Sequence, residues 1–288
     1  ITDQSAGSSN SWNAFHIENS KNTIFINNYV TKSNVNKDSY ASGLTSPSGT
    51  GTGNPLKISG CIFSGCEGQN GAILFLGGLD YDVTITNVTF EKTSNSYDND
   101  RGYLISINEV IKDPKLFFDS CTFSYLESNS KGGGSIGLWF KGTASSNNLL
   151  NMNLTFENSK FEHLNYLYNS LIGGAIQLCG SQVTNRYAHL TVRGCSFVNV
   201  SSPMGGAAIA YGSDTQQLLV ESSTFTTVKS KNSGSKGAIF IELKTQTQLA
   251  VINNCHFTDA VVASNGNGNA IYFSSTSNEK LIVQNCEF

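Results

Sequence analysis

The sequence predicts an all-β protein folded as a right-handed parallel β-helix, with three short strands per coil of about 31 residues and roughly 8–9 coils. Three observations predict this fold. Two short phrases alternate along nearly the whole chain, the strand alternation breaks at a fixed place inside one of them, and no sustained helical periodicity is present.

The first phrase joins a small residue to Ala-Ile, as in Gly174-Ala175-Ile176. Its Ile falls at positions 73, 136, 176, 209, 239 and 271, and the related segment 101–104 fills the widest interval. Repeats at this spacing are typical of solenoids, whereas leucine-rich repeats are shorter and propeller blades are longer. The phrase therefore marks one strand that recurs once per coil.

The second phrase has the template Leu-x-Val-x-Asn-Cys-x-Phe and occurs at 56–63, 83–90, 116–123, 154–161, 190–197, 218–225, 250–257 and 281–288. Side chains two residues apart share one face of a strand, but Val and Cys are three apart, so one residue must form a bend. The residue before Cys is the candidate, because Asn and Gly tolerate positive φ and Ser can hydrogen-bond its own turn. These predicted corner residues are Gly60, Asn87, Ser120, Asn158, Gly194, Ser222, Asn254 and Asn285.

Each coil therefore has two strands that meet at this corner and a third strand from the Ala-Ile phrase. Val, Ile, Phe and Thr dominate these segments, as expected of strands. Parallel strands joined by loops must stack coil on coil, about 4.8 Å apart, into a rod of roughly 40 Å. The crossover rule favours the right-handed form.

Composition excludes several classes of function. The 288 residues are 14% charged with a net charge of −3, and no basic run is present, so nucleic acid is not an expected partner. No apolar stretch is long enough for a transmembrane helix. No cofactor motif is found. We expect one β-helix domain over 1–288, and because both ends resemble strands without caps, we expect a segment of a longer rod or a filament subunit.

The alternating phrases resemble the β-helical passenger repeats of polymorphic outer-membrane proteins and of related protist surface proteins. The wider fold is similar to the pectin-lyase-like superfamily. The resemblance extends from about Phe15 to the end of the chain. It implies a secreted or surface-displayed rod that serves in adhesion or as a structural filament.

Seven cysteines are present, and five of them share one position of the second phrase. Val88, Ser159 and Ser223 occupy the same position in other coils, so we interpret it as a small inward-facing core position rather than a metal site. Cys255 and Cys286 fall in consecutive coils, where we expect thiols, and a disulfide state for Cys66 and Cys179 is left open. The core column is Cys61, Cys121, Cys195, Cys255 and Cys286.

A polysaccharide lyase or hydrolase of the pectin-lyase-like fold is the enzymatic alternative, since such enzymes use clustered carboxylates. Its candidate catalytic residues are Asp80, Asp82, Asp98 and Asp100, which also fit a simple role in turns. The four histidines are dispersed, and no metal ligands or cofactor site are predicted. The residues favour a non-enzymatic role.

Three sequons begin at Asn87, Asn153 and Asn199. A glycan at Asn87 would disturb the predicted corner, so Asn199, expected after a strand, and Asn153, expected at a loop end, are the better acceptors. The longest insertions are 42–54, 141–153 and 179–187, and binding on a solenoid usually lies in such loops. A carbohydrate-binding module is thus a further alternative.

The expected function is that of an extracellular or cell-surface β-helix with a structural or adhesive role. We expect it to be a glycoprotein that assembles end to end into fibres. Its expected partners are copies of itself or further coils, and a glycan or surface-protein ligand.

Overall fold

The computed structural model describes residues 15–16, 23–31, 44–46, 55–66, 73–76, 79, 81–95, 105–107, 113–128, 136–138, 150–167, 173–178, 186–212, 217–243, 248–276 and 278–288. In these residues every regular element is a β-strand, and the strands form three parallel sheets. This confirms the predicted solenoid with three short strands per coil. No helix of the described residues is long and apolar enough to cross a membrane.

Sheet I collects the strands of the Ala-Ile phrase. Its order is β1 (Phe15–His16), β4 (Leu44–Ser46), β7 (Leu74–Leu76), β11 (Ile105–Ile107), β14 (Ile136–Leu138), β17 (Ile176–Leu178), β20 (Ile209–Tyr211), β23 (Ile239–Leu243) and β27 (Ile271–Ser275).

Sheet II collects the first half of the second phrase. Its order is β2 (Thr23–Ile26), β5 (Leu56–Ser59), β8 (Val83–Thr86), β12 (Lys115–Asp119), β15 (Leu150–Glu157), β18 (Arg186–Arg193), β21 (Gln217–Glu221), β24 (Leu249–Asn253) and β28 (Lys280–Gln284).

Sheet III begins after the corner. It contains β3 (Tyr29–Thr31), β6 (Ile62–Ser64), β9 (Thr89–Glu91), β10 (Ser94–Asn95), β13 (Thr122–Ser128), β16 (Lys160–Tyr166), β19 (Ser196–Ser202), β22 (Thr224–Ser230), β25 (His256–Thr258) and β26 (Val261–Val262).

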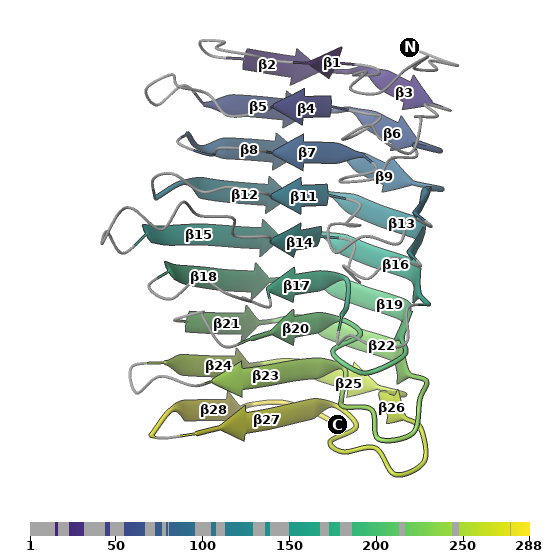
Figure 1. Cartoon of the computed structure of the whole chain (residues 1–288), viewed down its shortest axis with the longest axis vertical. Helices are drawn as coiled ribbons and strands as arrows, with labels where there is room; N and C mark the ends of the chain where they lie inside the picture. Colours follow the sequence, from purple (N-terminus) through teal and green to yellow (C-terminus); the bar gives the residue numbers. More distant parts are fainter. Residues whose placement is uncertain are drawn as a thin grey trace.

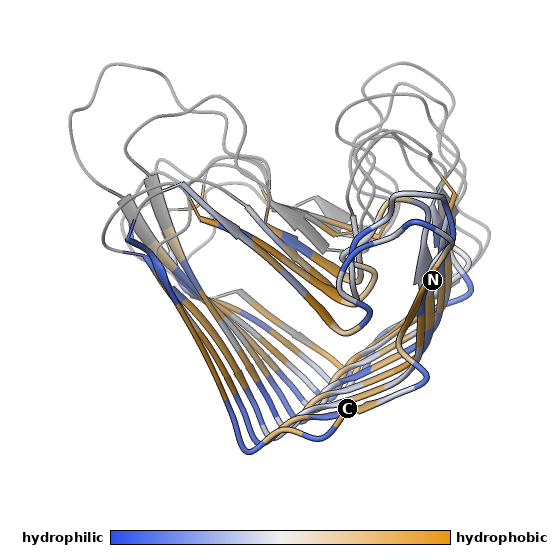
Figure 2. Cartoon of the chain, turned by 90° about the horizontal axis from the view of Figure 1, so that it is seen from below, coloured by the Kyte–Doolittle hydropathy of each residue, from blue (hydrophilic) through white to orange (hydrophobic). Residues whose placement is uncertain are grey.

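Neighbouring strands in each sheet come from successive coils, so each circuit of the chain adds one layer to the stack (Figure 1). Each such coil, with its three strands, is called a rung below. Viewed along the stack, the strands of each sheet lie one behind another, and hydrophobic positions fall in line from rung to rung (Figure 2). The register of the second phrase is constant: Leu190 pairs with Leu218, and Phe197 pairs with Phe225. Equivalent residues therefore stack directly on one another.

The core follows the template of the second phrase. On β12 the burial alternates, with Leu116 and Phe118 buried. After the corner at Ser120, Cys121 and Phe123 are again buried. In a straight strand, side chains three residues apart point to opposite faces. The bend at the corner residue turns the chain so that the side chains on both sides of it point into the core, which explains the spacing of three residues between Val and Cys in the second phrase.

The phenylalanines that end this phrase form a continuous stack. From Phe63 to Phe257, successive ring centroids lie 4.6–5.5 Å apart and the rings are within 11° of parallel. Every ring from Phe63 to Phe225 is fully buried. The spacing is close to the distance between strands, so the stack follows from the register. Its members are Phe63, Phe90, Phe123, Phe161, Phe197, Phe225 and Phe257.

The small-Ala-Ile phrase has a steric cause. A Cβ added at Gly174 would lie 1.9 Å from the carbonyl oxygen of Gly206, and one at Gly237 would lie 2.3 Å from that of Gly268. The following Ala and Ile are buried, as at Ala175 and Ile176. At Gly174 and Gly237 the chain therefore enters sheet I in direct backbone contact with the next rung, and a side chain at either position would clash with it.

Strands occupy parts of the three predicted insertions. β4 lies within 42–54, β15 begins inside 141–153, and β18 begins inside 179–187. The described parts of these segments pair with their neighbours in register. The loops are thus shorter than their sequence suggests, because segments rich in Ser, Asn and Gly still join the sheets.

Candidate functional surfaces

The eight predicted corner residues all have positive φ, between 50° and 61°, and Asn27 adds a ninth corner. Their backbone amides bond to the next rung, for example Asn158 N to Arg193 O at 3.0 Å. Side chains also bond along the rod: Asn158 Nδ2 donates to Asp119 Oδ1 at 3.0 Å, and Asn254 Nδ2 donates to Ser222 Oγ at 3.2 Å. This column joins rungs to one another.

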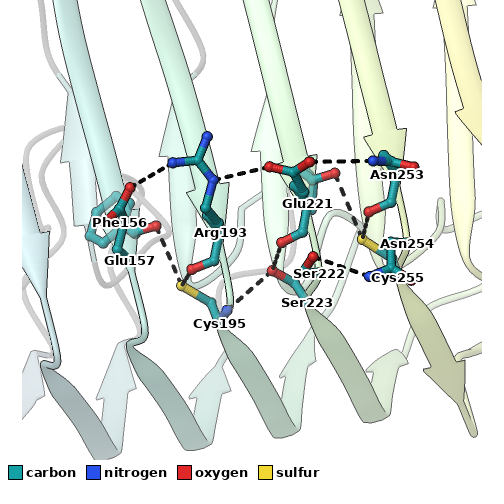
Figure 3. A network of polar contacts seen from close by, with 11 residues as sticks. Phe156, Glu157, Arg193, Cys195, Glu221, Ser222, Ser223, Asn253, Asn254 and Cys255 are labelled. Carbon is teal, nitrogen blue, oxygen red and sulfur yellow. Dashed lines mark hydrogen bonds and ion pairs between the residues drawn. The ribbon is translucent and has the colours of Figure 1, made fainter.

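A charged row runs beside the corner on sheet II (Figure 3). Arg193 contacts Glu157 at 2.8 Å on one side and Glu221 at 3.0 Å on the other, and Asn253 Nδ2 donates to Glu221 at 3.3 Å. The hydrogen bond to Glu221, with the nearby charges, raises the pKa of Arg193. The Arg193 side chain is 48% exposed, so the pairs stabilise the fold by less than about 1 kcal/mol each.

The cysteine column lies just inside the corner. Cys195 Sγ donates to Arg193 O at 3.4 Å and to Phe156 O at 3.6 Å. In the next rung Ser223 Oγ accepts from Cys195 N at 3.2 Å and donates to Glu221 O at 2.9 Å (Figure 3). Thiol and hydroxyl thus serve the same backbone groups, which explains why Cys and Ser interchange here.

Burial controls the chemistry of these thiols. It raises the pKa of Cys121 to about 11, that of Cys195 to about 12 and that of Cys255 to about 11. Cys255 and Cys286, in consecutive rungs, are thiols. Cys66 is buried after β6, and Cys179 lies outside the described residues. At neutral pH the thiol form of Cys121, Cys195 and Cys255 dominates, so these three sulfurs are poor nucleophiles.

A second column of positive φ runs through sheet III, two residues after each stacked Phe, and the sequence prediction missed it. It comprises Gly65, Lys92, Tyr125, His163, Asn199, Thr227 and Asp259, with φ of 52–64°. The residues share no type. The sequence nevertheless carries a signal. The residue after each kink, three positions beyond the Phe, is often apolar and buried, as at Leu126, Leu164 and Val200. In a straight strand a residue three positions from a buried Phe would point outward, so a buried apolar residue there indicates a bend.

The exposed side chains of this kink interact with one another. The Tyr125 and His163 rings stack with centroids 4.7 Å apart, and Asn199 Nδ2 lies 2.9 Å from His163 Nδ1. Because the amide nitrogen can only donate, Nδ1 is the acceptor in this contact. Three consecutive rungs thus present a phenol, an imidazole and an amide in one exposed row.

Of the four enzymatic candidates, Asp82 is the one that lies within the described residues. Asp82 is exposed, and its Oδ1 accepts a hydrogen bond from Lys115 N at 2.8 Å, which caps the start of β12. Asp80, Asp98 and Asp100 lie outside the described residues. Among the residues that the structure does describe, no group of three or more His, Cys, Asp or Glu could hold a metal ion. His256 pairs with Glu287 at 2.7 Å.

The structure changes the setting of the sequons. Asn87 occupies a corner, as the sequence indicates. Asn199 lies inside β19 rather than after a strand, and its Nδ2, the atom that would carry a glycan, contacts His163. Asn153 lies inside β15 rather than at a loop end, paired with Lys115 and His189 in register, and it is exposed.

In comparisons with known proteins, no family model, curated protein or solved structure matches this chain.

Proposed function

We propose that this chain is a structural or adhesive β-helix of the cell exterior, and that rods of this fold form its working element. The observation that carries the proposal is the unbroken side-chain register. The Phe stack, the corner column and the charged row each link several consecutive rungs. Polar side chains form hydrogen bonds and ion pairs with adjacent rungs, and such contacts stiffen a rod. Asp82, the catalytic candidate that the structure describes, caps the start of a strand.

Assembly through the ends of the stack is part of this proposal. Within the described residues, β28 has β24 as its one strand neighbour. Phe288 extends the aromatic stack from Phe257, with ring centroids 5.1 Å apart. An edge strand of this kind readily pairs with another strand, whether from further coils of the same chain or from a second copy.

Negative-stain electron microscopy of the protein from its natural source tests the structural role. Fibres, or rods much longer than about 40 Å, are the expected result. Discrete short particles would contradict assembly. A cell-adhesion assay with protein-coated beads tests the adhesive role separately, and turnover of any polysaccharide from a panel of neutral and acidic glycans would overturn the non-enzymatic assignment.

Exposure to an oxidising exterior is compatible with the buried thiols, whose raised pKa values slow oxidation. If the chain is secreted by a glycosylating cell, Asn153 is the best acceptor, since its exposed side chain forms no hydrogen bond within the described part of the chain. Peptide mapping before and after enzymatic deglycosylation would locate the modified asparagine. An unmodified Asn153 in material secreted by such a cell would remove this site from the proposal.

One observation favours a carbohydrate-binding module as the second candidate. Gln177 on β17 is 5% exposed, and among the described side chains its Oε1 is a buried oxygen that accepts no hydrogen bond. A buried unpaired acceptor destabilises the protein by about 1–3 kcal/mol, and a sugar hydroxyl could satisfy it. Glycan-array binding by the native protein that is lost in Gln177→Leu would support this function, and no binding in the array would remove it.

A further inference from the structure

One pair of thiols sets itself apart from the rest of the cysteine column. Each of the other cysteines in this column is followed in the next rung by Val or Ser, whereas Cys255 is followed by Cys286. Strands β24 and β28 pair residue by residue up to the corner, and an isolated bridge pairs the residues just after the two cysteines. The two thiols therefore occupy the same position in consecutive rungs.

The two side chains also have the same orientation. Cys255 Sγ donates to the carbonyl oxygen two residues earlier at 3.3 Å and to Val220 O in the preceding rung at 3.7 Å. Cys286 Sγ makes the equivalent contacts, at 3.2 Å to the carbonyl two residues earlier and at 3.7 Å to Ile252 O. Sulfurs oriented alike on paired strands are separated by the strand spacing, about 4.8 Å.

This separation suits a metal ion better than a disulfide. A disulfide requires sulfurs about 2.05 Å apart, so side chains in these parallel orientations would have to rotate to form one. Metal–thiolate bonds are about 2.3 Å long, so two of them in a straight line span about 4.6 Å. An ion that binds two ligands in line therefore fits between the sulfurs with little movement.

The surroundings of the pair select the class of ion. Structural zinc takes four ligands, and within the described residues no group of three or more His, Cys, Asp or Glu could hold a metal. Thiolates select soft ions, of which copper(I) is one. Burial raises the pKa of Cys255 to about 11, but a backbone hydrogen bond with Ser223 opposes this rise. The backbone of the preceding rung thus favours the charged sulfur that a metal requires.

We propose that Cys255 and Cys286 form a two-coordinate site for a soft monovalent cation of the copper(I) class. Both thiols lose their protons, and each sulfur donates an electron pair to the same ion, so one cation is bound and two protons leave. No electron is transferred. The ion lies between these two rungs and ties them together, and a further coil stacked on the second rung would leave the site in place.

Silver(I) is the probe for the first experiment, because it has the charge of copper(I) and shares its preference for two sulfurs in line. The full chain, freed of reductant, is titrated with silver(I) against a competing chelator. We expect a tight site that releases two protons per ion, with an affinity that rises about 100-fold per pH unit while both thiols are protonated. X-ray absorption should show two sulfur neighbours for this ion.

Cys286→Ser is the decisive variant, because the column already places Ser223 after Cys195 and the fold accommodates that pairing. Loss of an outer-shell partner weakens a metal site by about 10- to 100-fold, so loss of a ligand should weaken it by about 100-fold or more. Cys286→Val, which reproduces the pairing of Cys61 with Val88, is a second variant with the same expected result. Circular dichroism establishes that each variant is folded.

Cys195→Ser is the matched control, since it removes a single thiol of the same column and should leave the tight site unchanged. Equal silver(I) binding by the wild type and Cys286→Ser would overturn the proposal, as would loss of the tight site in Cys195→Ser. Peptide mapping without reduction is a further test, because a disulfide between Cys255 and Cys286 in the native protein would contradict it. Failure of copper(I) to bind this site under anaerobic conditions would overturn the assignment to its class.

Discussion

At the scale of single residues, the fold depends on positions where a backbone from the next rung leaves no room. Gly174 shows this most directly, since a Cβ there would lie 1.9 Å from Gly206 O and 2.7 Å from Ala207 O. Gly234 offers a contrast, because it has φ of 75° but nothing within 4 Å of its added Cβ. A comparison of substitutions at the two glycines therefore separates the effect of steric exclusion from the effect of backbone conformation.

We expect Gly174→Ala to lower the free energy of unfolding by about 3 kcal/mol or more, because a backbone carbonyl must move. Gly234→Ala should lower it by about 1 kcal/mol, the usual penalty for a left-handed residue with a Cβ. Urea unfolding followed by circular dichroism measures both values. Equal losses in the two variants would show that the close approach at Gly174 is relieved by local movement.

The buried thiols give the stability a dependence on alkaline pH. The pKa of Cys195 is about 12 in the folded state and about 9 when the thiol is exposed. Below pH 9 both states hold the proton and stability is constant. Between pH 9 and pH 12 the unfolded state releases it first, so stability falls as pH rises.

Cys195→Val should reduce the slope of this fall, measured as the free energy of unfolding at pH 8 to 11. The Val side chain fits, because Val88 occupies the same column. The variant also removes the thiol hydrogen bonds, so the comparison is of slopes and not of absolute stabilities. An unchanged slope would show that other groups control the alkaline transition.

At the scale of the strand, sheet III bends in every rung at residues that share no chemistry. Thr227 on β22 is the most strained, because a β-branched residue rarely adopts φ of 55°. Asn199 occupies the equivalent place in the preceding rung with φ of 53°. The bend is therefore imposed by the neighbouring strands and not by the preference of its own residue.

Thr227→Asn should raise the free energy of unfolding by about 1 kcal/mol, since Asn tolerates the left-handed conformation. Thr226→Asn is the matched control one residue earlier, where φ is negative, and it should lower stability because Thr favours strands. Thermal or urea unfolding measures both. A loss of stability in Thr227→Asn would mean that the Thr side chain makes a contact worth more than the strain.

The contrast between the two bends shows what a single sequence can reveal about this fold. The corner was predictable, because Gly, Asn and Ser recur there and because Val and Cys are three residues apart. The kink at Tyr125 or Lys92 was not found, because its residue types follow no rule. Its contact between His163 and Asn199 depends on three-dimensional register, so the sequence alone could not show that the exposed Asn199 side chain has a partner.

At the scale of the whole molecule, each rung contacts the rungs above and below it, so stability should be nearly a sum over rungs and their interfaces. The register supplies a direct test. His189 pairs with Gln217 and Leu190 pairs with Leu218, so removing residues 190–217 joins His189 to Leu218 and deletes one complete circuit. Side chains that point into the core on either side of the junction therefore still point into the core after the deletion.

We expect this variant to fold with an unchanged far-ultraviolet circular dichroism spectrum and a rod shorter by about 4.8 Å in small-angle X-ray scattering. Its free energy of unfolding should fall by the contribution of one rung. The same deletion made one residue shorter, 190–216, inserts Gln217 where Leu218 should point inward, and a one-residue slip exchanges the two faces of a strand. That control should be much less stable. If both deletions unfold the protein, the rungs are not interchangeable, and the segment 190–217 carries an interaction that its neighbours cannot replace.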